Sequence, residues 1–216
     1  MLKDLSNYRK SYKKKELLES NCPENPIQLF QTWFLNADSS EAVDESNAMT
    51  IASIGLDGFP KNRVVLLKKY TWEGFIFYTN YNSRKGQELQ ENPFAALLFF
   101  WDLLEQQVRI EGRVAPLPTA QSDAYFASRP IDSQIGALAS PQSTVIPNRQ
   151  SLLDTVNELQ AKHKANVPIV RPSYWGGFIV KPVEIEFWQG RANRLHDRIR
   201  YKLDSEYNWI IERLAP

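Results

Sequence analysis

Cysteine and long apolar runs are both scarce in this sequence. Cys22 is the only cysteine among 216 residues, which excludes an intrachain disulfide and a cysteine-based metal cluster. No apolar run approaches the roughly 20 residues of a membrane span, and the N-terminal MLKDLSNYRKSYKKKELLES lacks the apolar core of a secretory signal. We therefore expect a cytoplasmic protein with no metal site and no membrane partner.

An excess of charge of either sign is absent as well. The 26 basic and 25 acidic side chains give a formal net charge of +1. This balance argues against a nucleic-acid partner, because such proteins usually carry a strong basic excess. The glycine-rich GxGxxG and Walker fingerprints of nucleotide-binding proteins are also missing. Any recognition of an anion must therefore be local.

What the chain does have is many strand-length apolar runs. Hydrophobic residues make up 43% of it, so a sizeable core is feasible. Runs bounded by turn residues, typical of strands, lie at 48–54, 63–70, 74–80, 94–101, 105–117, 176–190, 196–201 and 207–214. Helices are expected at 25–40, 83–91, 118–140 with a break at Pro130, and 149–163. Hairpin-length turns between strands favour a mainly β, antiparallel barrel with peripheral helices over a parallel Rossmann sheet.

The sequence divides into a basic N-terminal arm at 1–20 and one domain at 21–216. The arm carries Arg9, Lys10, Lys13, Lys14 and Lys15. It is either a solvated, mobile segment or an arm that folds over an anionic site.

One candidate anion site is the start of the short helix at 83–91. Ser83 is a good N-cap, but Arg84 and Lys85 follow in the first turn, where the helix dipole disfavours cations. An anion at the helix start, most simply a phosphate, would remove the mismatch. The alternative is an exposed basic turn.

Two further groups have a functional and a structural interpretation. Tyr125, Arg129 and Ser133 follow at helical spacing and could form a cage for a phosphate monoester, or an ordinary solvated face. Arg63 and Lys68 close the two faces of an apolar strand, either as rim charges or as ligand-holding groups.

The stretch EFWQGRANRLHDR, at 186–198, places Arg194, His196 and Arg198 at every second position. On an extended strand these side chains would share one face. Two arginines around an imidazole suit a flat, electron-rich, anionic ring. The alternative, a structural histidine in a surface strand, leaves the cationic row unexplained.

These motifs resemble a known family. IEFWQGRANRLHDR resembles the C-terminal signature of pyridoxine/pyridoxamine 5′-phosphate oxidases. The segments RVVLLK, FYTNYNSRKGQEL, EQQVRIEG, YFASRPIDSQIGALASPQS, SYWGGF and ERLAP resemble that family too, in its order. The resemblance implies an FMN-binding split β-barrel of antiparallel Greek-key type with peripheral helices (α+β), in a homodimer with FMN between the subunits. It also implies oxidation of pyridoxamine or pyridoxine 5′-phosphate to pyridoxal 5′-phosphate, with O2 as acceptor and H2O2 released.

The resemblance carries roles to individual residues. FMN would be held by Arg63, Val64, Val65, Leu66, Leu67, Lys68, Tyr78, Thr79, Arg84, Lys85, Gln107, Gln142, Ser143, Trp188 and Arg198. The substrate would be bound by Arg9, Tyr12, Lys68, Tyr125, Arg129, Ser133, Arg194, Leu195 and His196. Arg194 and His196 would be the catalytic residues at the pyridine ring, and the arm segment at 9–12 would cover the substrate.

Two alternatives stay open at this stage. One is another flavin oxidoreductase on the same split barrel, and the other is a non-catalytic protein that binds FMN or pyridoxal phosphate. Fold alone does not separate them.

Overall fold

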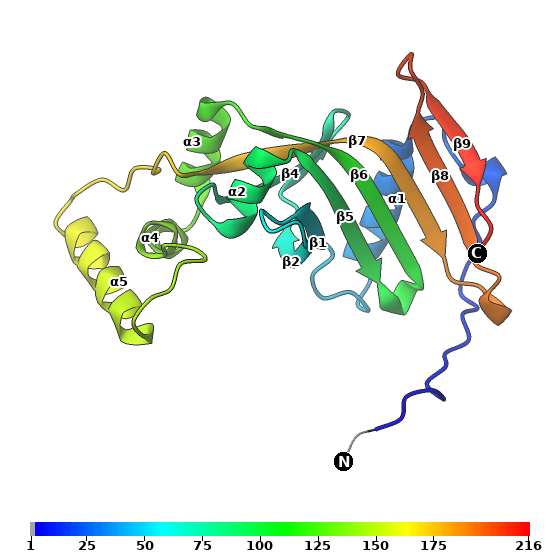
Figure 1. The fold of residues 1–216 in the computed structure, drawn as a ribbon, viewed down its shortest axis with the longest axis horizontal. Coiled ribbons are helices and arrows are strands. Elements are labelled where there is room, and N and C mark those ends of the chain that lie inside the picture. Colours follow the sequence, from blue (N-terminus) through cyan, green and yellow to red (C-terminus); the bar gives the residue numbers. More distant parts are fainter. Residues whose placement is uncertain (1–2) are drawn as a thin grey trace. The chain divides into compact units, whose positions relative to one another are not determined.

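Strands dominate residues 3–216, the part of the chain that the computed structural model describes (Figure 1). The strands are β1 Ala48–Ile54, β2 Pro60–Leu66, β3 Lys69–Thr71, β4 Gly74–Asn80, β5 Phe94–Trp101, β6 Gln106–Pro116, β7 Trp175–Gln189, β8 Asp197–Leu203 and β9 Trp209–Arg213. The helices are α1 Pro26–Asp38, α2 Arg84–Glu91, α3 Thr119–Ser128, α4 Ile131–Ala139 and α5 Arg149–Lys164. Short 3-10 turns lie at Glu19–Asn21, Asp102–Leu104 and Ala192–Arg194. No helix in this described part is long and apolar enough to cross a membrane.

The strands hydrogen-bond in the order β2-β1-β5-β6-β7-β4-β3, and β8 pairs with both β7 and β9. Strand β7 is the longest; β6 lies along one of its edges, and two antiparallel partners follow each other along the other edge. Residues 175–180 pair with β4, and residues 184–189 pair with β8. The mainly β architecture with peripheral helices is therefore the one that the alternation of apolar residues predicted.

Packing divides the chain into two units. Unit 1 contains the described residues up to Thr50, together with Leu97–Glu111 and Val183–Pro216. Unit 2 contains Ile51–Ala96 and Gly112–Pro182.

Unit 1 is organised by an aromatic core beneath helix α1. Asn25 caps this helix by accepting the Ile27 N–H at 2.9 Å, and Pro26 occupies its first turn. Phe30 and Trp33 then point to one side, where Phe30 meets Phe99 at 5.2 Å and Trp33 meets Phe187 at 5.3 Å between ring centroids. Burial of each such ring contributes on the order of 2 kcal/mol.

Unit 2 contains β4, the first part of β7 and the helices α2, α3, α4 and α5. Phe75, Phe77 and Phe178 are fully buried between these elements. Helices α4 and α5 pack on each other (Figure 1). The expected helix at 118–140 is interrupted at Pro130, as predicted, because proline removes a backbone donor.

The expected strand at 63–70 is wrong in its bounds. Strand β2 ends at Leu66 and β3 begins at Lys69, while the Lys68 N–H between them donates to the Ile76 carbonyl at 2.8 Å. The chain thus passes from one pairing to another at Leu67 and Lys68, which residue alternation does not reveal.

Candidate active site

The start of helix α2 is built as the sequence predicted. Ser83 is buried, and its Oγ accepts the Gly86 N–H at 3.2 Å. A Cβ at Gly86 would collide with the main-chain oxygens of Asn80 and Tyr81, so only glycine fits. Arg84 and Lys85 follow in the first turn. Two cations and the amides of the first turn therefore lie at the positive end of one helix, an arrangement that favours an anion.

Lys85 is a half-buried cation to which no carboxylate of residues 3–216 is bonded. Its Nζ donates to Gln142 Oε1 at 3.0 Å. Burial, and secondly the charge of Arg63, lower the pKa of Lys85 to about 8, against an opposing effect of Glu88. A bound anion beside Nζ would therefore stabilise the charged amine.

Lys85 lines a cavity of about 490 Å³ in unit 2. Ten of the predicted site residues line this cavity: Val64, Val65, Leu66, Lys68, Tyr78, Thr79, Lys85, Arg129, Ser133 and Gln142. Asn80, Gly136, Ala137, Ser140 and Trp175 complete its wall. Three cations, the hydroxyls of Thr79, Ser133 and Ser140, and two aromatic rings thus line a space large enough for a small organic phosphate.

Arg129 has a buried hydrogen-bond donor that a bound anion could satisfy. Its Nη1 is buried and has no hydrogen-bond partner among residues 3–216. The guanidinium stacks over the Trp175 ring at 4.7 Å, and burial lowers the pKa of Arg129. Ser133 lines the same cavity even though Pro130 separates the two helices. Tyr125 lies on the Tyr78 ring, with 3.8 Å between centroids.

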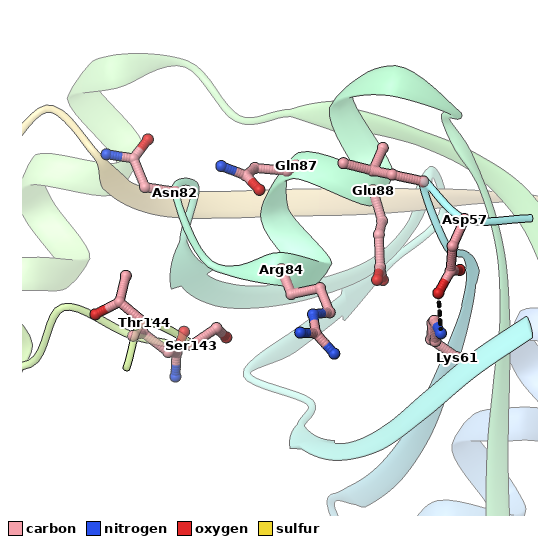
Figure 2. Close-up of a pocket in the computed structure, with 10 residues that line it drawn as sticks. Asp57, Lys61, Asn82, Arg84, Gln87, Glu88, Ser143 and Thr144 are labelled. Carbon is pink, nitrogen blue, oxygen red and sulfur yellow. Dashed lines mark hydrogen bonds and ion pairs between the residues drawn. The ribbon is translucent and has the colours of Figure 1, made fainter. Parts of the chain in front are cut away.

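A second cavity of about 390 Å³, also in unit 2, lies at the same helix start (Figure 2). Arg84 and Ser143, both predicted to hold FMN, line it together with Gln142, which is shared with the larger cavity. Figure 2 shows Arg84 of α2, Ser143 and Thr144 of the loop after α4, and the Asp57–Lys61 ion pair around this space. The two cations of the helix start therefore line neighbouring cavities that share Gln142.

Besides Tyr125, two predicted residues of unit 2 lie outside both cavities. Arg63 donates to Glu88 Oε2 at 2.9 Å and to Ser53 Oγ at 2.5 Å. Glu88 is itself buried, so Arg63 neutralises a carboxylate inside the protein. Leu67 is buried in the core.

The remaining predicted residues belong to unit 1, where His196 stands in an aromatic cluster. Trp188 lies 4.6 Å and Tyr12 lies 5.8 Å from the imidazole, between ring centroids. Tyr12 also meets Trp188 edge-on at 5.7 Å. The arm that carries Tyr12 is held there, because the Lys13 and Lys14 N–H groups donate to the buried Glu105 Oε2 at 2.8 and 3.0 Å. Arg9 is exposed.

Arg198 is fixed by a buried carboxylate. Its Nε and Nη2 donate to the two oxygens of Glu186 at 2.7 and 3.1 Å, and Arg109 Nη2 lies 2.9 Å from the same group. Arg198 pairs with Trp188 in the register of β8 and β7. Gln107 is half-buried on β6.

The prediction that Arg194, His196 and Arg198 share one face of an extended strand is wrong. Asn193 and Arg194 have φ of +56° and +62°, so the chain turns there, and β8 begins only at Asp197. Arg194 and Leu195 are exposed in this turn, and Arg198 alone lies on the strand. This turn reverses the chain so that β8 can pair antiparallel with β7. The alternating charged residues in the sequence give no sign of such a turn.

Two family models match the chain. The one described as pyridoxamine 5′-phosphate oxidase matches residues 35–163, and the one described as the pyridoxine 5′-phosphate oxidase C-terminal dimerisation region matches residues 175–216. Similar curated proteins include the pyridoxine/pyridoxamine 5′-phosphate oxidase of Flavobacterium psychrophilum, 56% identical over the whole of both chains. That of Haemophilus influenzae is 52% identical over 99% of this chain and all of the relative. The chain belongs to the pyridoxamine 5′-phosphate oxidase family.

Solved structures agree with this family. PhzG from Burkholderia lata, solved with tetrahydrophenazine-1-carboxylic acid, is 33% identical, with a TM-score of 0.85 over 93% of this chain and 98% of its own. An FMN-binding protein from Nostoc punctiforme, related to pyridoxamine 5′-phosphate oxidase, is 15% identical, with a TM-score of 0.68 over 90% of this chain and all of its own. The predicted family and the predicted split β-barrel fold are both confirmed.

Three polar or aromatic residues of this family member escaped the sequence prediction. Trp175, which stacks on Arg129, lies in the SYWGGF motif, so the motif was the available signal. Glu88 and Glu186 also lie in family motifs, but nothing local indicated their ion pairs, because their partners lie 25 and 12 residues away in the chain.

Proposed function

We propose that the protein oxidises pyridoxamine 5′-phosphate or pyridoxine 5′-phosphate to pyridoxal 5′-phosphate with bound FMN, using O2 and releasing H2O2. The oxidase assignment predicted from the sequence is confirmed at the level of the family, because full-length relatives at 52–56% identity carry that name. The identity of the cofactor, the residues that bind each ligand, the homodimer and the cytoplasmic setting belong to the proposal. From the alcohol, two electrons and two protons leave with O2 as H2O2. From the amine, water also enters and ammonia leaves.

The observation that carries the proposal is the cavity of unit 2. Arg129 Nη1 is buried without a partner, and Ser133, Lys68 and Tyr125 lie on or beside the same wall. We assign the substrate phosphate to these four residues, because an anion would satisfy Arg129 and relieve the burial that lowers its pKa.

The residues around the α2 start also fit a flavin phosphate. The Ser83-capped helix, Lys85 with its pKa lowered to about 8, and Arg84 supply amides and two cations for one dianion. Bound FMN would supply the redox chemistry, accepting a hydride from the substrate and passing the electrons to O2. Val64, Val65, Leu66, Tyr78, Thr79, Gln142 and Ser143 would line its remaining atoms.

Unit 1 supplies the residues assigned to the rings. Arg194 and His196 would meet the pyridine ring, Trp188, Gln107 and Arg198 would meet the flavin, and Tyr12 with Arg9 would exclude water above the substrate. Positive groups at these positions would stabilise the negative charge that develops during oxidation. A flavin oxidoreductase of unphosphorylated substrates or a passive carrier of FMN has no use for a second phosphate site such as the one at Arg129.

The test is whether bound flavin is reduced by the phosphorylated substrate. We expect purified protein to hold about one FMN per chain, to bleach with pyridoxine 5′-phosphate under anaerobic conditions, and to release H2O2 in air. Pyridoxine without its phosphate is the control and should reduce the flavin poorly. Replacement of Arg129 by Ala should raise the substrate KM by on the order of tenfold or more, since a charge-assisted hydrogen bond is lost. Flavin that binds but stays oxidised with both substrates would indicate a carrier, and bound FAD would contradict the cofactor assignment.

A further inference from the structure

The imidazole of His196 is oriented by the main chain of its own turn. The Arg191 N–H donates to His196 Nδ1 at 3.1 Å. A backbone N–H is always a donor, so the ring nitrogen facing it must carry a lone pair. The neutral imidazole therefore has its proton on Nε2, and this second nitrogen has no hydrogen-bond partner among residues 3–216.

Several contacts hold the imidazole in this orientation. Strand β7 ends at Gln189, and the Gly190 N–H donates to the Glu105 carbonyl at 2.7 Å, which fixes the chain immediately before Arg191. Trp188 and Tyr12 lie against the imidazole and restrict its rotation. The Arg191 side chain is itself held, by Glu16 at 3.1 Å and by Asp197 at 3.7 Å.

The surroundings of the ring favour its neutral form. Burial, and secondly Arg194, lower the pKa of His196 below its usual value, while Asp197 opposes them. Tyr12 lies against the imidazole, and Lys10 Nζ is 5.7 Å from the centroid of the Tyr12 ring. Burial and Arg194 thus disfavour a second proton on the ring, and the Arg191 N–H at Nδ1 leaves the single proton on Nε2.

We propose that His196 serves the substrate as a hydrogen-bond donor through Nε2–H, that the Arg191 main-chain amide sets this tautomer, and that His196 is not the proton acceptor. The proposal rests on the proposed function, in which His196 meets the pyridine ring. Its partner on the substrate is an acceptor such as the phenolate oxygen of that ring. Since Nδ1 is occupied by the Arg191 N–H, the neutral imidazole offers the substrate no lone pair.

The tautomer can be read without any ligand. The chain contains two histidines, His163 and His196, so the variant His163→Gln leaves one imidazole in the whole protein. His163 lies on α5, outside every residue assigned to the site. Nitrogen-15 NMR of this variant at pH 8 should show a protonated Nε2 and an unprotonated Nδ1. A protonated Nδ1 would overturn the proposal.

Two substitutions of His196 test whether it acts as a hydrogen-bond donor. In His196→Gln the amide NH2 can reach the place of Nε2, whereas in His196→Asn the amide reaches only the place of Nδ1. We expect His196→Gln to bind pyridoxal 5′-phosphate within about tenfold of the parent and His196→Asn to bind it about another tenfold more weakly, because a hydrogen bond to a charged acceptor is lost. Both variants should retain FMN, because His196 is not assigned to it.

The kinetic pattern then separates donor from base. With a donor, kcat/KM follows the same order as binding, and protonation of His196 costs the parent only the Arg191 contact, because imidazolium still donates from Nε2. Equal and severe losses in both variants, with parental activity falling as His196 is protonated, would show a general base instead. A parent that lacks oxidase activity would overturn the proposed function, while the NMR result would still decide the tautomer.

Discussion

Lys85 shows how the surroundings of one residue set its charge. Its amine is withdrawn from water beside Arg63, and its pKa falls to about 8. The folded state therefore bears the full cost of a buried charge below about pH 8, and this cost disappears as the pH rises toward the ordinary value of 10.5. A phosphate at the α2 start would act in the opposite sense, because it favours the protonated amine.

Binding of FMN should therefore weaken as the pH rises through about 8. Above that pH, the free protein has lost the proton that the bound anion requires, so binding must take one up. Titrations of the apoprotein with FMN between pH 7 and 10 measure this directly. The variant Lys85→Arg is the matched control, since arginine stays charged and should remove the pH dependence. Affinity in the parent that stays constant over this range would place the phosphate away from Lys85.

At the scale of elements, the turn at 190–196 determines how the arm meets the site. Gly190 has no side chain, and a Cβ built on it would lie 2.8 Å from Cγ and 2.9 Å from Cβ of Tyr12. These atoms are close to the arm's backbone, so a small rotation of the Tyr12 ring would not relieve the collision. The arm at 13–17 is tied down separately by Glu105 and Asp197.

The substitution Gly190→Ala should displace Tyr12 from His196 and Trp188 while the rest of the arm stays docked. We expect a higher substrate KM, by on the order of tenfold, because the ring that covers the substrate no longer packs and ordering it costs free energy. Flavin content should be unchanged, since Tyr12 is not assigned to FMN. The control is Tyr12→Phe, which keeps the packing. Parental KM in Gly190→Ala would mean that Tyr12 does not cover the substrate.

The sequence predicted elements far better than it predicted this turn. Apolar alternation located the strands, and Ser83 indicated the start of its helix because capping is local. The bend at Asn193 and Arg194 was missed because a positive φ leaves no periodic pattern. The pairs of Arg63 with Glu88 and Arg198 with Glu186 were missed because they form only when distant segments meet.

For the whole molecule, the main fact is that the assigned residues fall into two groups. The phosphate-binding group, with Arg129 and Lys85, belongs to unit 2, whereas the ring-binding group, with Trp188, Arg194 and Arg198, belongs to unit 1. The ring-binding residues just named lie within the segment that matches a C-terminal dimerisation region. A homodimer would therefore allow one chain to supply the phosphate sites and its partner the ring-binding residues of the same active site.

Mixing two inactive variants tests this arrangement. Arg129→Ala damages the phosphate group and Arg194→Ala damages the ring group, and each alone should lower kcat/KM by on the order of 10²-fold at the site it affects. If two chains build each site, a mixed dimer contains one site with both defects and one site with neither. Random exchange makes half of the dimers mixed, so activity should return to about a quarter of the parental value.

The controls decide between the two outcomes. Each variant exchanged with itself should stay inactive, and sedimentation before and after exchange should show a dimer. Dilution to the monomer should release flavin, because a shared site loses half of its contacts. If each site were built from one chain, every site in the mixed dimers would keep one defect and activity would not return. A monomer that still holds FMN tightly would also contradict the shared site.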